Sequence, residues 1–553
     1  MPKYNSMNEV PGYIKEKLKK FITNVGGETF VIVGLPSELT GGCLARYSRA
    51  PTGMQLTLVN EFLDENGDPS QQKGSELMDR VLNAFGDESV GELEGAHVGI
   101  ENISQLATKG LEDRRIGGSP IEQSTRYVKY DVKDEQGRWR YLRPKEIIES
   151  GLIERFEKVN DRAFEIYSKG IKLLIDYFKK EFPRSKQTID VIRDGKTVKV
   201  HEEELKNEDE ENAFNNAYNF TVRCAALDVG RCVLPSSTLT HLGIFGNGRF
   251  FTNVINYLKS SELLEEKERG KDLETELNKV IPTFIKRNKA NPKINETNRR
   301  MRKLSYELFS SIKPEDKRVT LITRMDYFDT IVATSLFPYT NISLMQTLSE
   351  VQKMPVDKKL DILNSYIGKR ESRRDRTGRS LEANYPLTFD LVGCFAEYRD
   401  LERHRMLTQQ RQLLTPDLGF IMPPEMGIVG LEKEVEELVE MMDDLNSDLR
   451  HASLEIQAQY ATLFNHRLRF MLGMNLREFQ HLSELRTQPA GHFSYRSMVM
   501  EMADKVKATY PWASKAFEFV DYSDPNNKIS RAKEQSKIAG KNLAKGIEGG
   551  IDL

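Results

Sequence analysis

Two short motifs recur in the same order in both halves of this 553-residue chain, and this recurrence is what most constrains the fold. An arginine-rich stretch occupies 113–127 in the first half and 403–415 in the second. Each stretch is followed by an Asn-x-Arg motif, at 247–249 and 475–477, with a further polar residue four positions after its Arg. One such motif by itself would be an ordinary polar surface. Two motifs repeated in order indicate an internal duplication, and therefore two homologous domains.

The composition excludes several classes of protein. The 81 Lys and Arg nearly balance the 83 Asp and Glu, so no global field drives the chain onto nucleic acid or an anionic membrane. The 4 Cys form no Cys-x-x-Cys pair, which argues against a disulfide scaffold or a zinc site, and we expect no metal. The polar N-terminus is not a signal peptide, and no apolar run reaches the roughly 18 residues of a membrane helix. We therefore expect a cytoplasmic protein that binds neither membrane nor nucleic acid.

Hydrophobic periodicity and composition divide the chain into five segments. We predict an N-terminal lead-in at 1–25, a first domain at 26–285, a linker at 286–316, a second domain at 317–525 and a disordered tail at 526–553. The first domain contains a long amphipathic helix at 152–182, because apolar residues recur there at three- and four-residue spacing. An alternating stretch around Asp194-Gly195 predicts an inserted hairpin near 188–200. The tail is rich in Lys, Gly and Ser, which is typical of a solvated segment.

The first arginine-rich stretch combines a loop with chemically diverse side chains. Gly117, Gly118 and Pro120 break any helix there. A carboxylate, an amide, a hydroxyl and a guanidinium then follow within five positions, supplied by Glu122, Gln123, Ser124 and Arg126. Ser and Arg can hold phosphate oxygens, and the other two suit hydroxyl groups or base edges, so the set fits a phosphorylated sugar. The alternative is a polar loop with no ligand.

The second stretch places two fixed cations beside a titratable ring, at Arg403, His404 and Arg405. An anion such as a pyrophosphate, or an electron-rich carbonyl edge, would justify that concentration of charge. The alternative is a solvated basic helix face. In the later motifs, helical spacing puts the Arg and the polar residue after it on one face; the residues concerned are Asn247, Arg249 and Asn253 in the first half and Asn475, Arg477 and His481 in the second.

At these residues the chain resembles the flavin-dependent thymidylate synthase family, as a tandem duplication of the family's domain. The family's signature is Arg-His-Arg, then Glu-x-Ser-x-Arg, a later Arg before Leu-Pro, Asn-x-Arg, and a catalytic Arg 9 positions beyond. The resemblance implies an α+β fold in which each domain is an antiparallel sheet wrapped by helices. It also implies FAD as cofactor and the reductive methylation of dUMP to dTMP, with NADPH and methylenetetrahydrofolate as co-substrates.

The two halves keep complementary parts of that signature. The first half keeps the nucleotide segment, with Glu122, Ser124 and Arg126, and the later phosphate-binding Arg at Arg231. It lacks Arg-His-Arg, where Asp113 and Arg114 stand, and it has Leu258 at the catalytic position. The second half keeps Arg-His-Arg, Asn-x-Arg, the catalytic Arg at Arg486 and, after an insertion, a flavin-side His at His492. It has lost the nucleotide segment, at 411–415, and has Gln459 in place of the phosphate-binding Arg.

In the family, a dUMP site takes Arg-His-Arg and the catalytic Arg from one subunit and the nucleotide segment from another. We therefore hypothesise that the two halves together build one competent site, while the reciprocal site is vestigial. A homodimer of this chain would then mimic the family's tetramer. The resemblance assigns dUMP to Glu122, Gln123, Ser124, Arg126, Arg231, Arg403 and Arg486, with Arg486 catalytic. It assigns FAD to Arg403, His404, Arg405, Asn475, Arg477, His481 and His492, together with Asn247, Arg249 and Asn253.

Asp400 leaves other functions open. The resemblance places a Gln there, in the dUMP pocket, and a carboxylate near a phosphate is repulsive unless it is paired. One alternative is a flavin-dependent enzyme that acts on another nucleotide. Another is a non-catalytic protein that kept the fold for interactions only.

Overall fold

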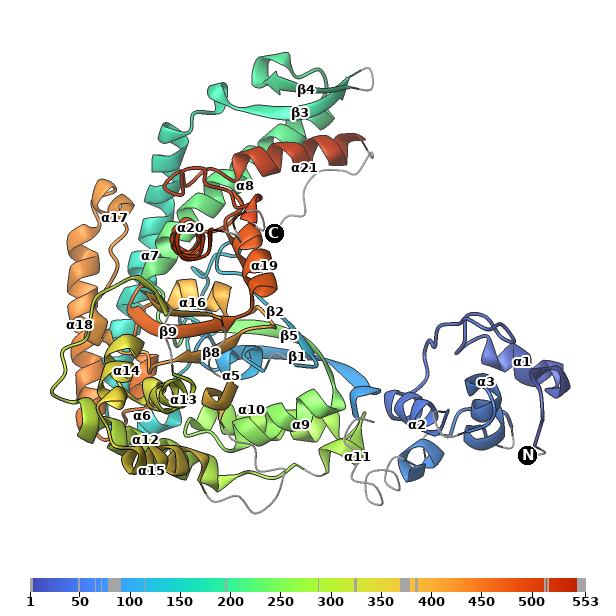
Figure 1. Cartoon of the computed structure of the whole chain (residues 1–553). Helices are drawn as coiled ribbons and strands as arrows, with labels where there is room; N and C mark the ends of the chain where they lie inside the picture. The colour runs from blue at the N-terminus through green and yellow to red at the C-terminus, as the bar shows by residue number, and fades with distance from the viewer. Residues whose placement is uncertain are drawn as a thin grey trace. The chain divides into compact units, whose positions relative to one another are not determined.

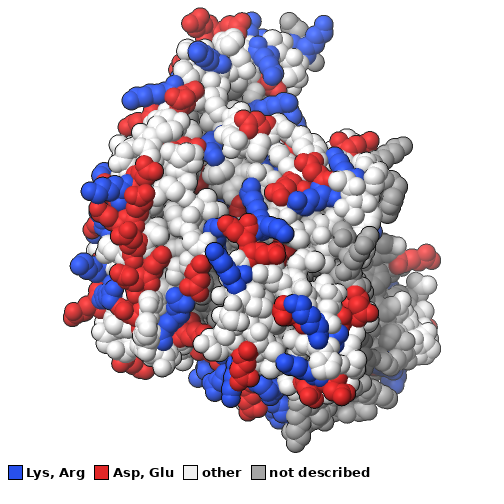
Figure 2. Space-filling view, turned by 60° about the vertical axis from the view of Figure 1, so that its left-hand side comes forward, with Lys and Arg blue, Asp and Glu red and all other residues white. Residues whose placement is uncertain are grey.

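The computed structural model describes residues 3–47, 50–64, 66–70, 72–77, 91–114, 116–193, 196–286, 288–322, 326–368, 378–382, 386–511, 514 and 517–544. The chain forms two compact units. Unit 1 comprises Met1–Ile103, Ala107–Glu122 and His241–Asn295, and unit 2 comprises Ser104–Leu106, Gln123–Thr240 and Glu296–Leu553. On the face drawn in Figure 2, basic and acidic side chains are intermixed among the described residues.

Unit 1 contains a three-stranded sheet in the order β1-β5-β2, in which β2 and β5 are antiparallel (Figure 1). Its strands are β1 (Gly95–Ser104), β2 (Gly118–Glu122) and β5 (Leu239–Asn247). Its helices are α1 (Gly12–Leu18), α2 (Ser37–Tyr47), α3 (Met54–Thr57), α5 (Thr108–Glu112), α9 (Gly248–Lys259), α10 (Leu264–Leu277) and α11 (Pro282–Ile285). One face of the sheet packs on α9 and α10 through a core that includes Ile100, Ile244, Phe251 and Val254.

Unit 2 contains a four-stranded antiparallel sheet in the order β6-β7-β9-β8. Its strands are β6 (Val319–Ile322), β7 (Leu387–Cys394), β8 (Thr408–Arg411) and β9 (Arg467–Met474). Every residue of β7 is buried, as expected of a central strand, although Thr388 and Asp390 interrupt its apolar sequence. The expectation of a mixed α+β protein with antiparallel sheets is therefore confirmed.

Besides this sheet and the inserted hairpin described below, unit 2 is built mainly from helices. They are α6 (Lys145–Glu149), α7 (Ile153–Glu181), α8 (Glu208–Gly230), α12 (Pro292–Phe309), α13 (Tyr327–Leu336), α14 (Leu344–Gln352), α15 (Val356–Ile367), α16 (Phe395–Leu401), α17 (Pro424–Ile428), α18 (Glu432–His451), α19 (Leu476–Arg486), α20 (Phe493–Thr509) and α21 (Ala532–Ala544). The long helix predicted at 152–182 is α7. It buries one stripe, with Phe156, Val159, Ala163 and Leu174 among its members, and this is the pattern that predicted it.

The duplication is visible in the main-chain hydrogen bonds between the two repeats. Ser236 N donates to Thr462 O, and Phe464 N donates to Leu234 O, each at 2.8 Å. In the two repeats Leu234 corresponds to Thr462 and Ser236 to Phe464, so exchanging the repeats converts one bond into the other. The two segments are antiparallel across this point. Such reciprocity is what a two-fold relation between homologous halves produces.

The repeated Asn-x-Arg motifs begin corresponding helices. The Asn247 side chain accepts a hydrogen bond from Phe250 N at the start of α9, and Asn475 does the same for Glu478 N at the start of α19. Asn is among the best N-cap residues, because its oxygen satisfies a main-chain donor that the helix cannot. In this structure each Asn therefore has a local role in directing the helix that follows its strand.

The predicted hairpin and the tail pack against each other. Strands β3 (Thr188–Arg193) and β4 (Lys196–His201) pair antiparallel, while the Asp194-Gly195 turn lies outside the described residues. The segment expected to be a disordered tail contains α21, which lies along β3 and α8 (Figure 1). Gly540 allows this contact, because a Cβ there would stand 2.3 Å from the Asp190 carbonyl oxygen. Gly540 therefore permits close packing of α21, although the composition of this segment is typical of a solvated tail.

The segment expected to be a linker is helical in the structure. Residues 286–316 contain α12, which buries Met301 and Phe309 in a core with α13, α14 and α15. The apolar residues of this segment are few but recur at helical spacing, which composition alone does not reveal. The lead-in contains α1, whose Ile14 and Leu18 belong to an N-terminal apolar cluster with α2 and α3.

We predict that Gly540→Ala loosens the C-terminal helix. In an isolated helix Ala is about 1 kcal/mol better than Gly, so the substitution should stabilise α21 by itself. Here the new methyl group meets main chain, and we expect a lower melting temperature and faster tryptic release of the C-terminal segment. Lys541→Ala, at an exposed position of the same helix, is the control and should change neither. A melting temperature that rises in Gly540→Ala would contradict this packing.

Candidate functional site

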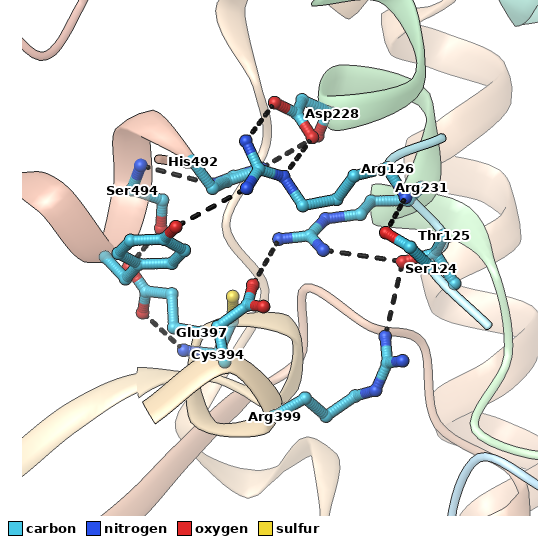
Figure 3. A network of polar contacts seen from close by, with 12 residues as sticks. Ser124, Thr125, Arg126, Asp228, Arg231, Cys394, Glu397, Arg399, His492 and Ser494 are labelled. Carbon is cyan, nitrogen blue, oxygen red and sulfur yellow. Dashed lines mark hydrogen bonds and ion pairs between the residues drawn. The ribbon is translucent and has the colours of Figure 1, made fainter. Parts of the chain in front are cut away.

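A cluster of charged side chains in unit 2 draws its members from both repeats (Figure 3). The first repeat supplies the loop after β2, with Ser124, Thr125 and Arg126, and the end of α8, with Asp228 and Arg231. The second repeat supplies residues from α16, the turn after it, the end of α19 and the start of α20; they are Arg399, Asp400, Arg403, His404, Arg486, His492 and Tyr495. Some of the sequence-predicted residues of the two halves therefore lie close together in this cluster.

Arg126 is saturated by protein groups. Its Nε and Nη2 form a bidentate pair with Asp228, at 2.7 and 2.9 Å. Nη2 also donates to Ala490 O at 3.2 Å, and Nη1 to the Tyr495 hydroxyl at 3.4 Å. Burial by itself would raise the pKa of Asp228, but Arg126 and His492 hold it well below its usual range. Arg126 is therefore a fixed, paired cation in this structure.

Arg231 and Arg399 converge on one hydroxyl group. Both donate through Nη1 to Thr125 Oγ1, each at 3.4 Å, and both side chains point toward Thr125 in Figure 3. Arg231 is 2% exposed, and its Nε has no hydrogen-bond partner among the described residues. Burying a guanidinium is costly unless its donors are satisfied. Because Arg231 and Arg399 share the neutral Thr125 hydroxyl as an acceptor at this point, their guanidinium groups could bind an anion here.

Asp400 lies among four guanidinium groups. Its carboxylate accepts from Arg403 Nη2 at 2.8 Å and from Arg231 Nη2 at 3.4 Å. Burial by itself would raise the pKa of Asp400, but Arg231, Arg403, Arg126 and Arg486 together hold it well below its usual range. A carboxylate at this position would repel a phosphate unless it were paired, and in the structure Asp400 is paired with Arg403 and Arg231.

His404 connects the Arg-His-Arg motif to Arg486. Arg486 Nε donates to His404 Nε2 at 2.9 Å, so the imidazole proton must reside on Nδ1, which lies 2.9 Å from Glu478 Oε1. Burial lowers the pKa of His404, and Arg486 adds to this effect, although Glu478 opposes it. The neutral ring therefore orients the guanidinium of Arg486.

His492 caps the helix that borders the cluster. Its Nδ1 accepts from Ser494 N at 3.2 Å, and its Nε2 donates to Asp228 O at 3.0 Å. Burial and the charge of Arg231 lower the pKa of His492 well below its usual value. The resemblance assigns His492 to the flavin side of the site, and in the structure it joins the start of α20 to the end of α8.

The remaining cations predicted from the second repeat lie at the surface. Arg405, Arg477 and His481 are exposed, and Arg477 and His481 are one turn apart on α19. The ring of His481 lies 5.6 Å from that of His404. These exposed side chains can be reached by an anionic ligand from solvent, and His481 lies beside His404, which pairs with the half-buried Arg486.

The predicted residues of the first repeat's Asn-x-Arg motif belong to unit 1. Arg249 forms an ion pair with Glu92, with Nη1 and Oε1 at 2.5 Å, and Asn253 lies on α9. Glu122 also belongs to unit 1, where its carboxylate is 3.6 Å from the buried Lys109 ammonium. Gln123 belongs to unit 2 and accepts from the Tyr130 hydroxyl at 3.2 Å. These contacts give Glu122 and Gln123 structural partners within their own units.

The reciprocal positions are filled by the protein itself. Leu258, at the position of Arg486, is fully buried in the first repeat's core. Gln459, at the position of Arg231, accepts from Arg411 Nη1 at 3.1 Å and from Leu414 N at 3.2 Å. Leu414 is fully buried as well. Leu258 and Gln459, which carry no charge, thus stand where the cluster has Arg486 and Arg231, and Leu414 stands where it has Thr125.

Sequence reasoning assigned no role to four contributors: Thr125, Asp228, Arg399 and Tyr495. Asp228 lies three residues before Arg231, and Arg399 lies four residues before Arg403, so helical spacing could have suggested both. Nothing in the sequence indicates that Tyr495 would lie beside arginines from both repeats. Its ring centroid is 5.9 Å from the Arg126 guanidinium and 5.8 Å from that of Arg486.

Comparison with known proteins agrees with the duplication. The model of a family described as thymidylate synthase complementing protein matches the chain twice, at residues 44–283 and 307–512. A UPF0159 protein of Chlamydia muridarum is 35% identical over 95% of this chain and 97% of its own length. A UPF0159 protein of Chlamydia pneumoniae is 35% identical over 92% and 95%, and one of Thermoplasma acidophilum is 29% identical over 90% and 99%. No helix within the described ranges is long and apolar enough to span a membrane.

We predict that the protein loses stability as the pH falls below about 6.5. His404 and His492 have lowered pKa values in the folded protein, so below the ordinary imidazole pKa the unfolded chain binds more protons. His492→Asn keeps an N-cap acceptor but removes one titrating ring. Urea unfolding at about pH 7.5 and 5.5 should therefore show a smaller loss in this variant. His451→Asn, at an exposed position, should retain the wild-type loss; equal losses in all three proteins would contradict the assignment.

We predict that Arg126→Met lowers the free energy of unfolding by about 3–5 kcal/mol, because it leaves Asp228 buried without its partner. Adding Asp228→Asn should recover much of this loss, since it removes the uncompensated charge. Arg450→Met, which breaks the exposed pair with Asp417, should cost less than about 1 kcal/mol. A double variant less stable than Arg126→Met would show that Asp228 has another stabilising role.

Proposed function

The chain belongs to the thymidylate synthase complementing protein family, and from this premise we propose that it is an FAD-dependent thymidylate synthase whose competent site is shared by its two repeats. The reaction would be the reductive methylation of dUMP to dTMP, with methylenetetrahydrofolate and NADPH as co-substrates. The specific fold of each repeat, an antiparallel sheet wrapped by helices, is proposed to be that of the family. We further propose that the protein acts in the cytoplasm.

One observation carries the proposal. Arg126 from the first repeat and Arg486 from the second approach the same Tyr495 ring, at 5.9 and 5.8 Å, and both lower the pKa of Asp400. This proximity supports the proposal that the two repeats supply complementary parts of one site within a single chain. The buried Leu258 and Leu414 support the view that the reciprocal site has no function. A homodimer would then contain two sites.

The cluster suits the phosphate and the base of dUMP. Arg231 and Arg399 around Thr125 form the cationic end, where a phosphate would find buried donors with Ser124 beside them. Arg126 holds the surrounding loop through Asp228, Ala490 and Tyr495. Arg486, oriented by neutral His404, would donate to the uracil carbonyl edge and stabilise negative charge that develops on the ring. Fixing both ends of the nucleotide positions the reacting carbon.

The exposed donors fit a flavin dinucleotide. FAD carries a pyrophosphate, which requires cations and hydrogen-bond donors that a ligand can reach. Arg405, Arg477 and His481 have that exposure, and Arg403 is 31% exposed. They would hold FAD, together with Asn475 at the start of α19; Asn247, Arg249 and Asn253 are proposed to contribute from the first repeat. When bound, FAD supplies the redox chemistry of the reaction.

We predict that Arg486→Ala lowers dTMP formation by at least about 10²-fold, as expected when a donor to developing charge is removed. Ser124→Ala, which changes the first repeat whereas Arg486→Ala changes the second, should weaken dUMP binding. Leu413→Ala, at the position in the second repeat that corresponds to Ser124, is the matched control and should retain activity. The measurements are dTMP formation, release of the dUMP C5 proton, and flavin absorbance after reconstitution with FAD.

Each outcome separates the alternatives. A protein that shows no flavin absorbance and no affinity for FAD would be a non-catalytic relative. A flavoprotein that releases no C5 proton from dUMP would act on another substrate. A loss in Leu413→Ala as large as that in Ser124→Ala would contradict the pairing of the repeats.

A further inference from the structure

Arg231 is a buried cation of the cluster that has only weak partners. Its guanidinium has five N–H donors, yet its two contacts, to Thr125 and Asp400, are both long at 3.4 Å. Its Nε has no partner among the residues that the structure describes. Arg126, by contrast, reaches Asp228, Ala490 and Tyr495 through bonds that begin at 2.7 Å. Of these two arginines, Arg231 is the one with donors to offer an incoming anion.

Asp400 already lies against those donors. One of its oxygens bonds to Arg403 at 2.8 Å, and the other lies at the longer distance from Arg231. Arg403 follows Asp400 by three residues, and its side chain is 31% exposed, whereas that of Arg231 is 2% exposed. The shorter bond is therefore on the solvent side, and the longer contact is on the buried side. Shifting Asp400 fully toward Arg403 would free Arg231.

The carboxylate stays charged, so it acts as a resident anion. The surrounding guanidinium groups keep the pKa of Asp400 well below its usual range, and protonation offers no relief at neutral pH. A dianionic phosphate at Arg231 would meet this charge at close range in a buried environment, where screening by water is weak. A neutral nucleoside carries no phosphate and would not be repelled by Asp400.

We propose that Asp400 is a specificity-determining residue, an internal counter-anion that competes with the phosphate of the ligand for Arg231. The identity of the nucleotide rests on the function proposed above, but the competition for Arg231 does not. As a result, the phosphate group of a ligand contributes less to its binding affinity than the number of arginines suggests. Removing the charge of Asp400 should increase the affinity for ligands that carry a phosphate and not for those that lack one.

The test is a calorimetric titration of the full-length protein with three probes: inorganic phosphate, dUMP and deoxyuridine. Asp400→Asn preserves the size of the side chain and an oxygen acceptor for Arg403. We expect this variant to bind phosphate and dUMP about tenfold more tightly, the scale of one charged hydrogen bond, with the affinity for deoxyuridine unchanged. Asp400→Gln, which carries the amide that the resemblance places here, should show the same order and serves if Asp400→Asn does not fold.

Asp417→Asn is the matched control, because it removes a carboxylate from the exposed pair with Arg450. It should leave all three affinities unchanged. Weaker or unchanged phosphate binding in both Asp400 variants overturns the proposal, as does an equal gain for deoxyuridine, since a structural role would not distinguish the probes. If phosphate binding gains but dUMP binds no better than phosphate in any variant, Asp400 keeps its role and the proposed nucleotide function fails.

Discussion

The reciprocal main-chain pairing between the repeats is the constraint on which the rest of the site depends. The bonds from Ser236 to Thr462 and from Phe464 to Leu234 fix the end of α8 against the segment that leads into β9. Main-chain bonds of this kind do not depend on side-chain identity, so the arrangement can persist while the two sequences diverge. Once the pairing is set, Arg231 of one repeat lies beside Asp400 of the other.

That arrangement shows how the proposed site would draw on two diverged copies. The first repeat contributes the loop after β2 and the end of α8, and the second contributes α16, α19 and the start of α20. On this proposal the combination carries the cations that bind the ligand. The corresponding positions of the opposite combination include Leu258 and Leu414, whose burial stabilises the fold instead.

The cluster also shows how buried charge is balanced. Arg126 has a bidentate carboxylate, Arg486 has a neutral imidazole, and Arg231 has only long contacts. A buried cation with a strong partner holds structure in place, while one with weak partners can exchange them for a ligand. Arg126 and Arg231, which the resemblance assigns to the same nucleotide, therefore differ in how strongly their protein partners hold them.

The sequence by itself determined the duplication, the family and the mixed α+β class, because motif order survives divergence and hydrophobic periodicity reports secondary structure. It also predicted α7 from its apolar stripe, and the paired strands of the hairpin. Only the tertiary structure decided that Asp228 pairs with Arg126, that Tyr495 lies beside both Arg126 and Arg486, and that α21 packs through Gly540. These contacts join residues distant in the chain, and no local spacing encodes them. The pairing of Asp400 belongs with them, since a carboxylate's partners depend on which charges folding brings near it.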